Sequence, residues 1–127
     1  MARAFDRGDI VRVNLNPVTG HEIQGEMRPC LVISSAAFNR VSGVSYVAPI
    51  SQGGNYARVA GFTVSLMNSG CKTQGVAIMS MTRPVDLAAR GARKVETAPD
   101  FVVEEAVGKF TGMFEASRLS LELPVPI

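Results

Sequence analysis

The chain of 127 residues lacks the residues that metal sites, disulfide frameworks and membrane spans require. Its only histidine is His21, and its two cysteines, Cys30 and Cys71, lie far apart in dissimilar contexts. This excludes a Cys/His cluster with zinc-ligand spacing, and we predict two reduced, structural cysteines. No apolar run approaches the roughly 18 residues that span a bilayer, and residues 1–9 carry charges where a signal peptide is apolar. We therefore expect a cytoplasmic protein with no membrane association and no cofactor.

Negative charge is almost absent from the middle of the chain. Residues 27–95 hold eight arginines and lysines against Asp86 alone, a net charge of +7, whereas residues 96–127 carry a net charge of −4. This asymmetry is expected if a polyanion docks on one face. Most of these cations are arginines, which suit bidentate phosphate contacts. The alternative is a basic surface that only balances an acidic helix within the fold.

With 46% apolar and 19% charged residues, the composition is that of a soluble globular domain. We expect one domain over residues 1–115, followed by a tail over 116–127 that is either flexible or introduced by cloning. Short alternating or apolar runs between glycine turns predict a mainly β fold, a small barrel or sandwich. The expected strands are residues 10–15, 30–33, 44–48, 62–66, 75–79 and 93–95.

Three shorter features complete the expected fold. Residues 34–40 are compatible with one helical turn and residues 84–89 with a short helix, while Pro49 marks the end of its strand or an edge position. The last element is an amphipathic helix that reaches about Glu115. Thr97 is its predicted N-cap, with Pro99 and Asp100 in the first turn.

Residues 19–29 form a glycine-broken stretch rich in groups that transfer protons or bind anions. His21 stands directly beside Glu22, and Arg28 precedes Pro29, which favours an extended backbone at the start of the next strand. We interpret the stretch as a functional loop; the alternative is a polar hairpin loop with solvated charges. A second loop, residues 51–55, combines glycines that allow close backbone approach with the polar side chains of Ser51, Gln52 and Asn55.

These motifs, in this order and spacing, resemble the MazF/PemK/Kid/ChpB family of bacterial toxins from about Phe5 to Glu115. The matching segments are residues 7–11, 16–17, 20–22, 24–25, 28–29, 36–40, 49–51, 53–55 and 89–91. The resemblance implies an SH3-like small barrel of the MazF/CcdB type with a C-terminal helix. It also implies a homodimer that is the toxin of a type II toxin–antitoxin system. Such a toxin cleaves single-stranded mRNA sequence-specifically and without metal, and so inhibits translation and growth.

The resemblance also implies partners and site residues. A cognate acidic antitoxin restrains the toxin, which reaches operator DNA only through the antitoxin complex. His21, Glu22 and Arg28 fall on the catalytic loop of the family, and Ser51 falls where a threonine is usual. An arginine and an aspartate take part in chemistry in the Kid-like branch, but Ile78 and Ser80 occupy those positions here. An aspartate base is therefore not expected.

The chemistry agrees with the residues present. RNA supplies its own nucleophile, the 2′-hydroxyl, so the enzyme needs a base, an acid and positive charge on the phosphorane. Glu22 or His21 can accept the 2′ proton and the other can help protonate the 5′ oxygen, while Arg28 clamps the phosphate and Ser51 adds a hydrogen bond. Further candidates for holding RNA are Gln24, Gln52, Asn55, Arg58, Arg83 and Arg90. The alternative for each is an ordinary solvent-exposed surface side chain.

Two other classes of function remain open from the sequence. One is a non-enzymatic barrel toxin similar to CcdB, which poisons gyrase through a C-terminal helix that carries a tryptophan; this chain has none. The other is a peptide-binding adaptor similar to SH3 domains. Such grooves are rich in aromatic residues, which make up only 6% of this chain.

Overall fold

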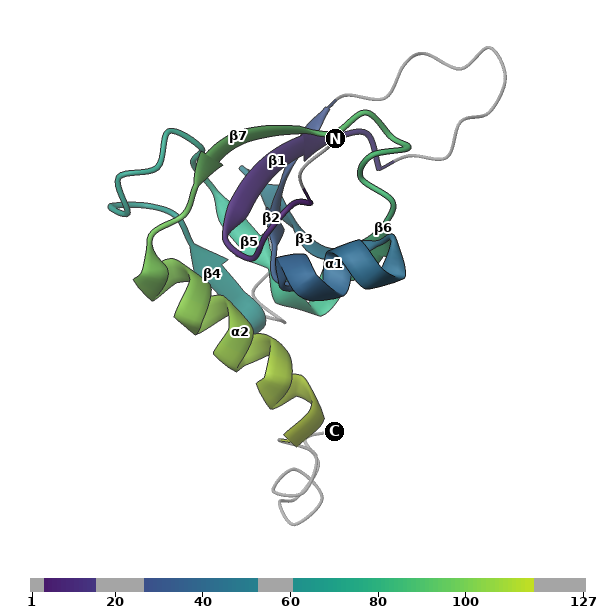
Figure 1. The fold of residues 1–127 in the computed structure, drawn as a ribbon. Helices are drawn as coiled ribbons and strands as arrows, with labels where there is room; N and C mark the ends of the chain where they lie inside the picture. Colours follow the sequence, from purple (N-terminus) through teal and green to yellow (C-terminus); the bar gives the residue numbers. More distant parts are fainter. Residues whose placement is uncertain (1–3, 16–26, 53–60, 116–127) are drawn as a thin grey trace.

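The computed structural model describes residues 4–15, 27–52 and 61–115, and its fold is mainly β (Figure 1). The strands are β1 (Asp9–Val13), β2 (Arg28–Val32), β3 (Ser45–Ser51), β4 (Thr63–Ser65), β5 (Val76–Ile78), β6 (Arg83–Val85) and β7 (Arg93–Thr97). The helices are α1 (Ala36–Ser42), the short 3-10 helix η2 (Met79–Met81) and α2 (Asp100–Glu115). The predicted tail, residues 116–127, lies outside the described residues.

All strand pairs are antiparallel, and the strand order is β4-β5-β3-β2-β1-β7, with β6 beside β3. This confirms the predicted mainly β fold with a C-terminal helix. The sheet curves as a small barrel does (Figure 1), but among the described residues the end strands β4 and β7 do not pair, so the barrel stays open.

Pro49 lies inside β3 rather than at its end. It is opposite Cys30 of β2, while on the other side β3 pairs with β6 up to Val47 and with β5 from Ile50 onward. The missing N–H of proline therefore falls where β3 changes neighbours, a position at which no ladder hydrogen bond is lost.

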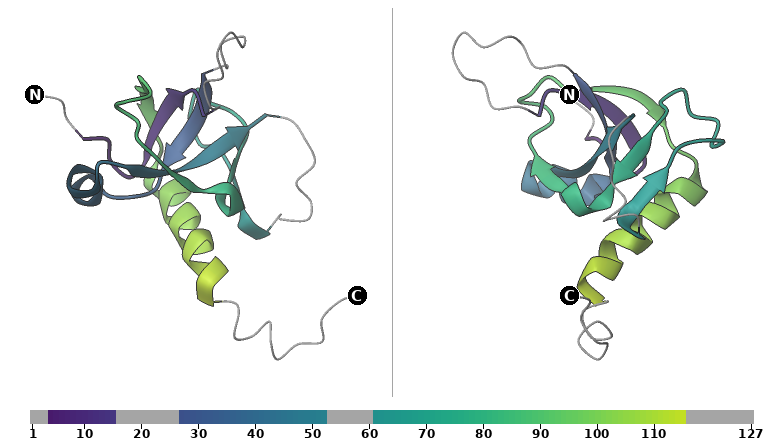
Figure 2. Two further views of the ribbon diagram at one scale, coloured as in Figure 1. Left: turned by 90° about the vertical axis from the view of Figure 1, so that its right-hand side faces the viewer. Right: turned by 180° about the vertical axis from the view of Figure 1, so that it is seen from behind.

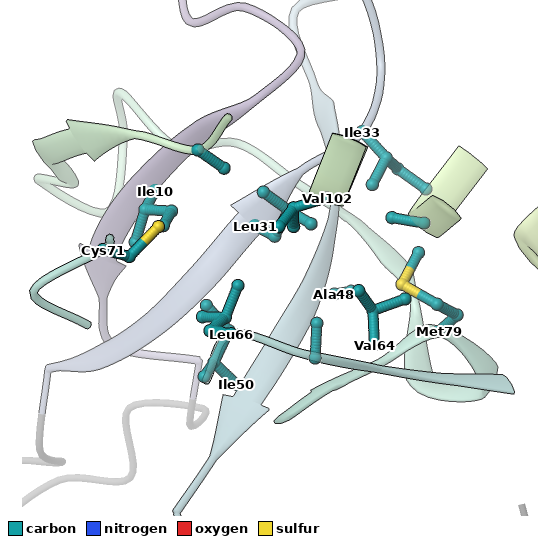
Figure 3. Close-up of a cluster of buried hydrophobic side chains, with 13 residues drawn as sticks. Ile10, Leu31, Ile33, Ala48, Ile50, Val64, Leu66, Cys71, Met79 and Val102 are labelled. Atoms are coloured by element: carbon teal, nitrogen blue, oxygen red, sulfur yellow. The ribbon is translucent and has the colours of Figure 1, made fainter. Parts of the chain in front are cut away.

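Both faces of the curved sheet are buried. Because neighbouring strand residues point to opposite faces, Ile10 and Leu31 enter one core while Val11 and Cys30 enter the other. The larger core lies under α2, which contributes Val102 (Figure 3). Figure 2 shows α2 at the opposite end of the molecule from the C-terminal end of β1 and the N-terminal end of β2. The helix thus covers the larger core and leaves these two strand ends uncovered.

Two local predictions are wrong. Residues 84–89 do not form a helix, because residues 83–85 pair with residues 45–47 as β6 and the following turn is held by the Asp86 side chain, which accepts from the Ala89 N–H at 3.0 Å. Thr97 is not an N-cap, because it is the last residue of β7 and lies opposite Asp9. Both errors arise from strand pairing between distant segments, which local propensity does not encode.

Pro99, predicted in the first turn of the C-terminal helix, instead immediately precedes α2. Two other helix signals are confirmed. The helical turn expected within residues 34–40 corresponds to the start of α1, which Ser35 caps by accepting from the Phe38 N–H at 3.3 Å. It ends at Gly43, whose φ of +81° gives the left-handed C-cap. Asp100 lies in the first turn of α2, as expected for a carboxylate at the positive end of the helix dipole.

Candidate active site

A cleft of about 290 Å³ brings together three of the predicted site residues. Arg28 comes from the start of β2, Ser51 from the end of β3 and Arg83 from the start of β6. The complete lining is Leu15, Arg28, Pro49, Ile50, Ser51, Ile78, Met81 and Arg83. None of these described lining residues is acidic, so the cleft presents two guanidinium groups and a hydroxyl against an apolar wall.

Strand register explains why Arg28 and Ser51 share the cleft. In the β2–β3 pair Cys30 lies opposite Pro49, and the same antiparallel register continued by two residues places Arg28 beside Ser51. Arg28 also lies opposite Val13 of β1, with its side chain exposed. The Arg28-Pro29 pair thus begins an extended strand, as predicted, and places an exposed arginine at the start of β2.

Ser51 is held in place by a close backbone approach. Gly75 has a φ of +120°, and a Cβ there would lie 2.5 Å from the Ser51 carbonyl oxygen. Only glycine fits, because any larger residue would push β5 away from β3. The neighbouring residue Gln52 donates from its side-chain amide to the Gln74 carbonyl at 3.3 Å. Gln52 therefore links the end of β3 to the residue before Gly75, and it does not line the cleft.

Arginine side chains anchor both ends of the segment that carries His21 and Glu22. The Arg83 guanidinium donates to the Leu15 carbonyl at 3.4 Å and the Arg90 guanidinium donates to the Asn14 carbonyl at 2.9 Å. At the other end Arg12 donates to the Met27 carbonyl at 3.0 Å. The residues on either side of this segment are therefore held by arginine side chains, and two of its neighbours, Leu15 and Arg28, line the cleft.

Five predicted site residues lie outside the described residues: His21, Glu22, Gln24, Asn55 and Arg58. Their structural predictions stay predictions. The cleft nevertheless adjoins the stretch of chain that carries His21, Glu22 and Gln24, because its lining residues Leu15 and Arg28 flank residues 16–27. Arg90 does not line the cleft, but its hydrogen bond to the Asn14 carbonyl places it next to Leu15, which does.

Cys30 is buried in the second core, close enough to Arg28 and Arg83 for their charges to act on its thiol. Burial raises the pKa of its thiol to about 12, although the positive charges of Arg28 and Arg83 act in the opposite direction. The thiol is therefore protonated at neutral pH and unsuited to nucleophilic chemistry. Cys30 and Cys71 are both buried and free, which confirms the structural role predicted for them.

The basic residues of the middle of the chain do not all gather at this cleft. Arg40 and Lys94 line a separate cavity of about 530 Å³ that also contains Asp6 and Asp9. There Lys94 forms an ion pair with Asp9 at 3.2 Å. Arg40 and Lys94 therefore line a different cavity that has carboxylates of its own, so only part of the +7 charge is available to a polyanion at the cleft.

Five lining residues were not predicted as site residues: Leu15, Pro49, Ile50, Ile78 and Met81. Leu15 was predicted only as the last residue of a strand, and Met81 lies in η2, a short 3-10 helix that no sequence pattern predicted.

Within residues 4–15, 27–52 and 61–115, no group of three or more histidines, cysteines or carboxylates could hold a metal ion. In the same ranges, no helix has both the length and the apolar character to cross a membrane.

Comparison with known proteins decides the family. The sequence model of the PemK-like, MazF-like toxins of type II toxin–antitoxin systems matches residues 6–114. The chain belongs to this family. It is similar to the endoribonuclease toxin ChpB of Escherichia coli strain K12, at 48% identity over 87% of this chain and 95% of that toxin. It is also similar to the endoribonuclease PemK of Escherichia coli, at 43% identity over 84% of this chain and 80% of PemK.

A solved structure agrees with the sequence relatives. A MazE–MazF crystal structure (Form-II) from Deinococcus radiodurans has a TM-score of 0.73 and 32% identity, and the similarity covers 88% of this chain and 96% of that one. The family membership predicted from the sequence motifs is therefore confirmed for this PemK-like, MazF-like toxin.

Proposed function

We propose that this family member is an endoribonuclease that cleaves single-stranded mRNA in the cytoplasm, sequence-specifically and without a metal ion, and so arrests translation and growth. The observation that carries the proposal is the cleft in which Arg28, Arg83 and Ser51 converge at the base of residues 16–27. Two guanidinium groups and a hydroxyl suit a phosphodiester, whose charge grows in the transition state. The relatives PemK and ChpB are named endoribonucleases, which supports the same reaction.

The cleft also supports a division of roles. Arg28 holds the scissile phosphate through its planar guanidinium group, and Arg83 adds positive charge from β6. The Ser51 hydroxyl donates a hydrogen bond to a phosphate oxygen. No carboxylate or imidazole is present among the described residues that line the cleft, so the base must come from elsewhere. Glu22 or His21 takes the 2′ proton, and the other assists protonation of the 5′ oxygen.

The test is to incubate the purified protein with a long RNA in EDTA and to map the cut ends. The proposal expects a 5′-hydroxyl on one fragment and a cyclic or opened phosphate at the 3′ end of the other. Arg28→Ala is the matched loss-of-function control. Intact RNA combined with arrested gyrase would instead favour the CcdB-like reading.

We propose further that a cognate acidic antitoxin competes with RNA for the cationic cleft. The partner chemistry is complementary, because the described lining of the cleft carries two arginines and no carboxylate. Solved relatives include MazE–MazF complexes, which supports an antitoxin partner. Simultaneous, non-competitive binding of RNA and antitoxin would contradict this part of the proposal. Operator DNA is expected to bind only through that complex.

The predicted homodimer has a candidate surface that shares no lining residue with the cleft. A groove of about 510 Å³ between α1 and α2 is lined mainly by apolar side chains, including Phe38, Tyr46, Phe110 and Phe114. Phe114 is 66% exposed, so the face suits an apolar copy of itself better than an acidic antitoxin. Light scattering should give a dimer mass that Phe114→Glu reduces to a monomer mass. A wild-type monomer at micromolar concentration would refute the homodimer.

A further inference from the structure

Met81 is a large apolar side chain exposed at the rim of the cationic cleft. Its side chain is 52% exposed, although Ile50 and Ile78 of the same lining are each only 2% exposed. Arg28 and Arg83 line the same cleft. One cleft therefore combines positive charge, which suits a phosphate, with an exposed apolar surface that has no covering partner among the described residues lining it.

The backbone that carries Met81 is firmly fixed. Met79, two residues earlier in η2, is fully buried in the core under α2. Thr82 closes the turn, since its N–H donates to the Met79 carbonyl at 3.2 Å and its hydroxyl donates to the same oxygen at 2.7 Å. Met81 thus projects from a rigid support, and the exposed thioether is the adaptable part.

We propose that Met81 is the platform for a nucleobase next to the scissile phosphate. This inference rests on the proposed ribonuclease function and deepens it. A nucleotide pairs an anionic phosphate with a flat ring that has an apolar face, and the cleft offers partners for both within one space. At about 290 Å³ the cleft is at the lower end of small-molecule sites, which hold roughly 300–1,000 Å³, so it suits one nucleotide.

The contact should help to bind the base without identifying it. A thioether is polarisable and packs against aromatic rings, but it is only a weak hydrogen-bond acceptor. Met81 therefore responds to the presence and area of a ring rather than to its donor and acceptor pattern. Such a contact stabilises the bound RNA equally in the ground state and the transition state, so it acts on affinity rather than on the chemical step.

The first experiment compares steady-state cleavage of a short RNA by Met81→Ala, Met81→Leu and wild type. Met67→Ala is the matched control, because Met67 is 64% exposed but lies outside the cleft lining. We expect Met81→Ala to raise KM roughly two- to tenfold with little change in kcat. Met81→Leu should retain most of the affinity, and Met67→Ala should match wild type. Equal kinetics for Met81→Ala and wild type would overturn the inference.

The second experiment identifies the base itself. RNAs with a single abasic site at each position around the cut are cleaved by wild type and by Met81→Ala. If Met81 contacts a base, the two losses are non-additive at one position only, where Met81→Ala has no further effect. Additive losses at every position would overturn the inference while leaving the ribonuclease intact. Failure of the wild type to cleave the parent RNA would instead overturn the proposed function, and this inference with it.

Discussion

Arg28→Lys separates geometry from charge at the phosphate site. Arg28 begins β2 with its side chain exposed and lines the cleft beside Ser51 and Arg83. Lysine keeps the positive charge, but its compact ammonium cannot contact two phosphate oxygens in one plane as the guanidinium fork does. The substitution should therefore remove one donor of the transition state and leave the field of the cleft largely unchanged.

The expected loss follows from that single donor. Removing one preorganised transition-state donor typically costs about 3 kcal/mol, or about a hundredfold in rate. Stability should hardly change, because an exposed side chain at a strand end contributes within about 0.5 kcal/mol. Arg28→Lys should thus be nearly inactive and fully folded.

The assay is kcat/KM on a fluorogenic RNA, with the thermal midpoint of each variant measured in parallel. Arg40→Lys is the matched control, because Arg40 lines the other, mixed-charge cavity and should retain wild-type activity. If Arg28→Lys cleaves within threefold of wild type, bidentate clamping is refuted and only the charge at this position matters. If Arg40→Lys loses activity equally, the cleft is not the site.

Three further outcomes are expected. Cys30→Ala should remain active, because the buried thiol is protonated, but should lower the free energy of unfolding by about 1–2 kcal/mol, measured by urea titration. Gly75→Ala should lose both stability, by more than about 1 kcal/mol, and cleavage, because its Cβ collides with the Ser51 backbone; wild-type values for both would contradict this. Burial acts to raise the pKa of Glu96, but hydrogen bonds from the Thr73 hydroxyl and from the backbone N–H groups of Lys72 and Thr73 lower it below its usual 4.5. Glu96→Gln should therefore be less stable than wild type at pH 7, and the difference should shrink as the pH falls through the lowered pKa; a difference independent of pH would contradict the assignment.

Local patterns were sufficient to predict most strands of this fold. Alternation at residues 10–15 and the apolar run at residues 30–33 correspond to β1 and β2, and the amphipathic helix predicted to reach about Glu115 corresponds to α2. These signals are local, so one sequence contains them. The errors at residues 84–89 and at Thr97 have a common cause, because there pairing with a distant strand overrides the local preference.

The candidate site was predictable in its residue types but not in its assembly. Arg28 and Ser51 could be singled out from glycine and proline punctuation around them, yet only the β2–β3 register shows that they are neighbours. Arg83 joins them because β6 pairs with β3, which no short motif indicates. Met81 carries no sequence signal at all, since an exposed methionine in a turn has no pattern.

The most direct test of the proposed function uses an RNA substrate with one 2′-deoxy sugar immediately before the cleaved bond. Attack by the 2′-hydroxyl predicts that this bond stays intact in the presence of wild-type protein, while every other recognised site in the same RNA is cut. If the modified bond is still cleaved, the nucleophile is not the 2′-hydroxyl, and the roles proposed for Glu22, His21 and Arg28 are wrong together.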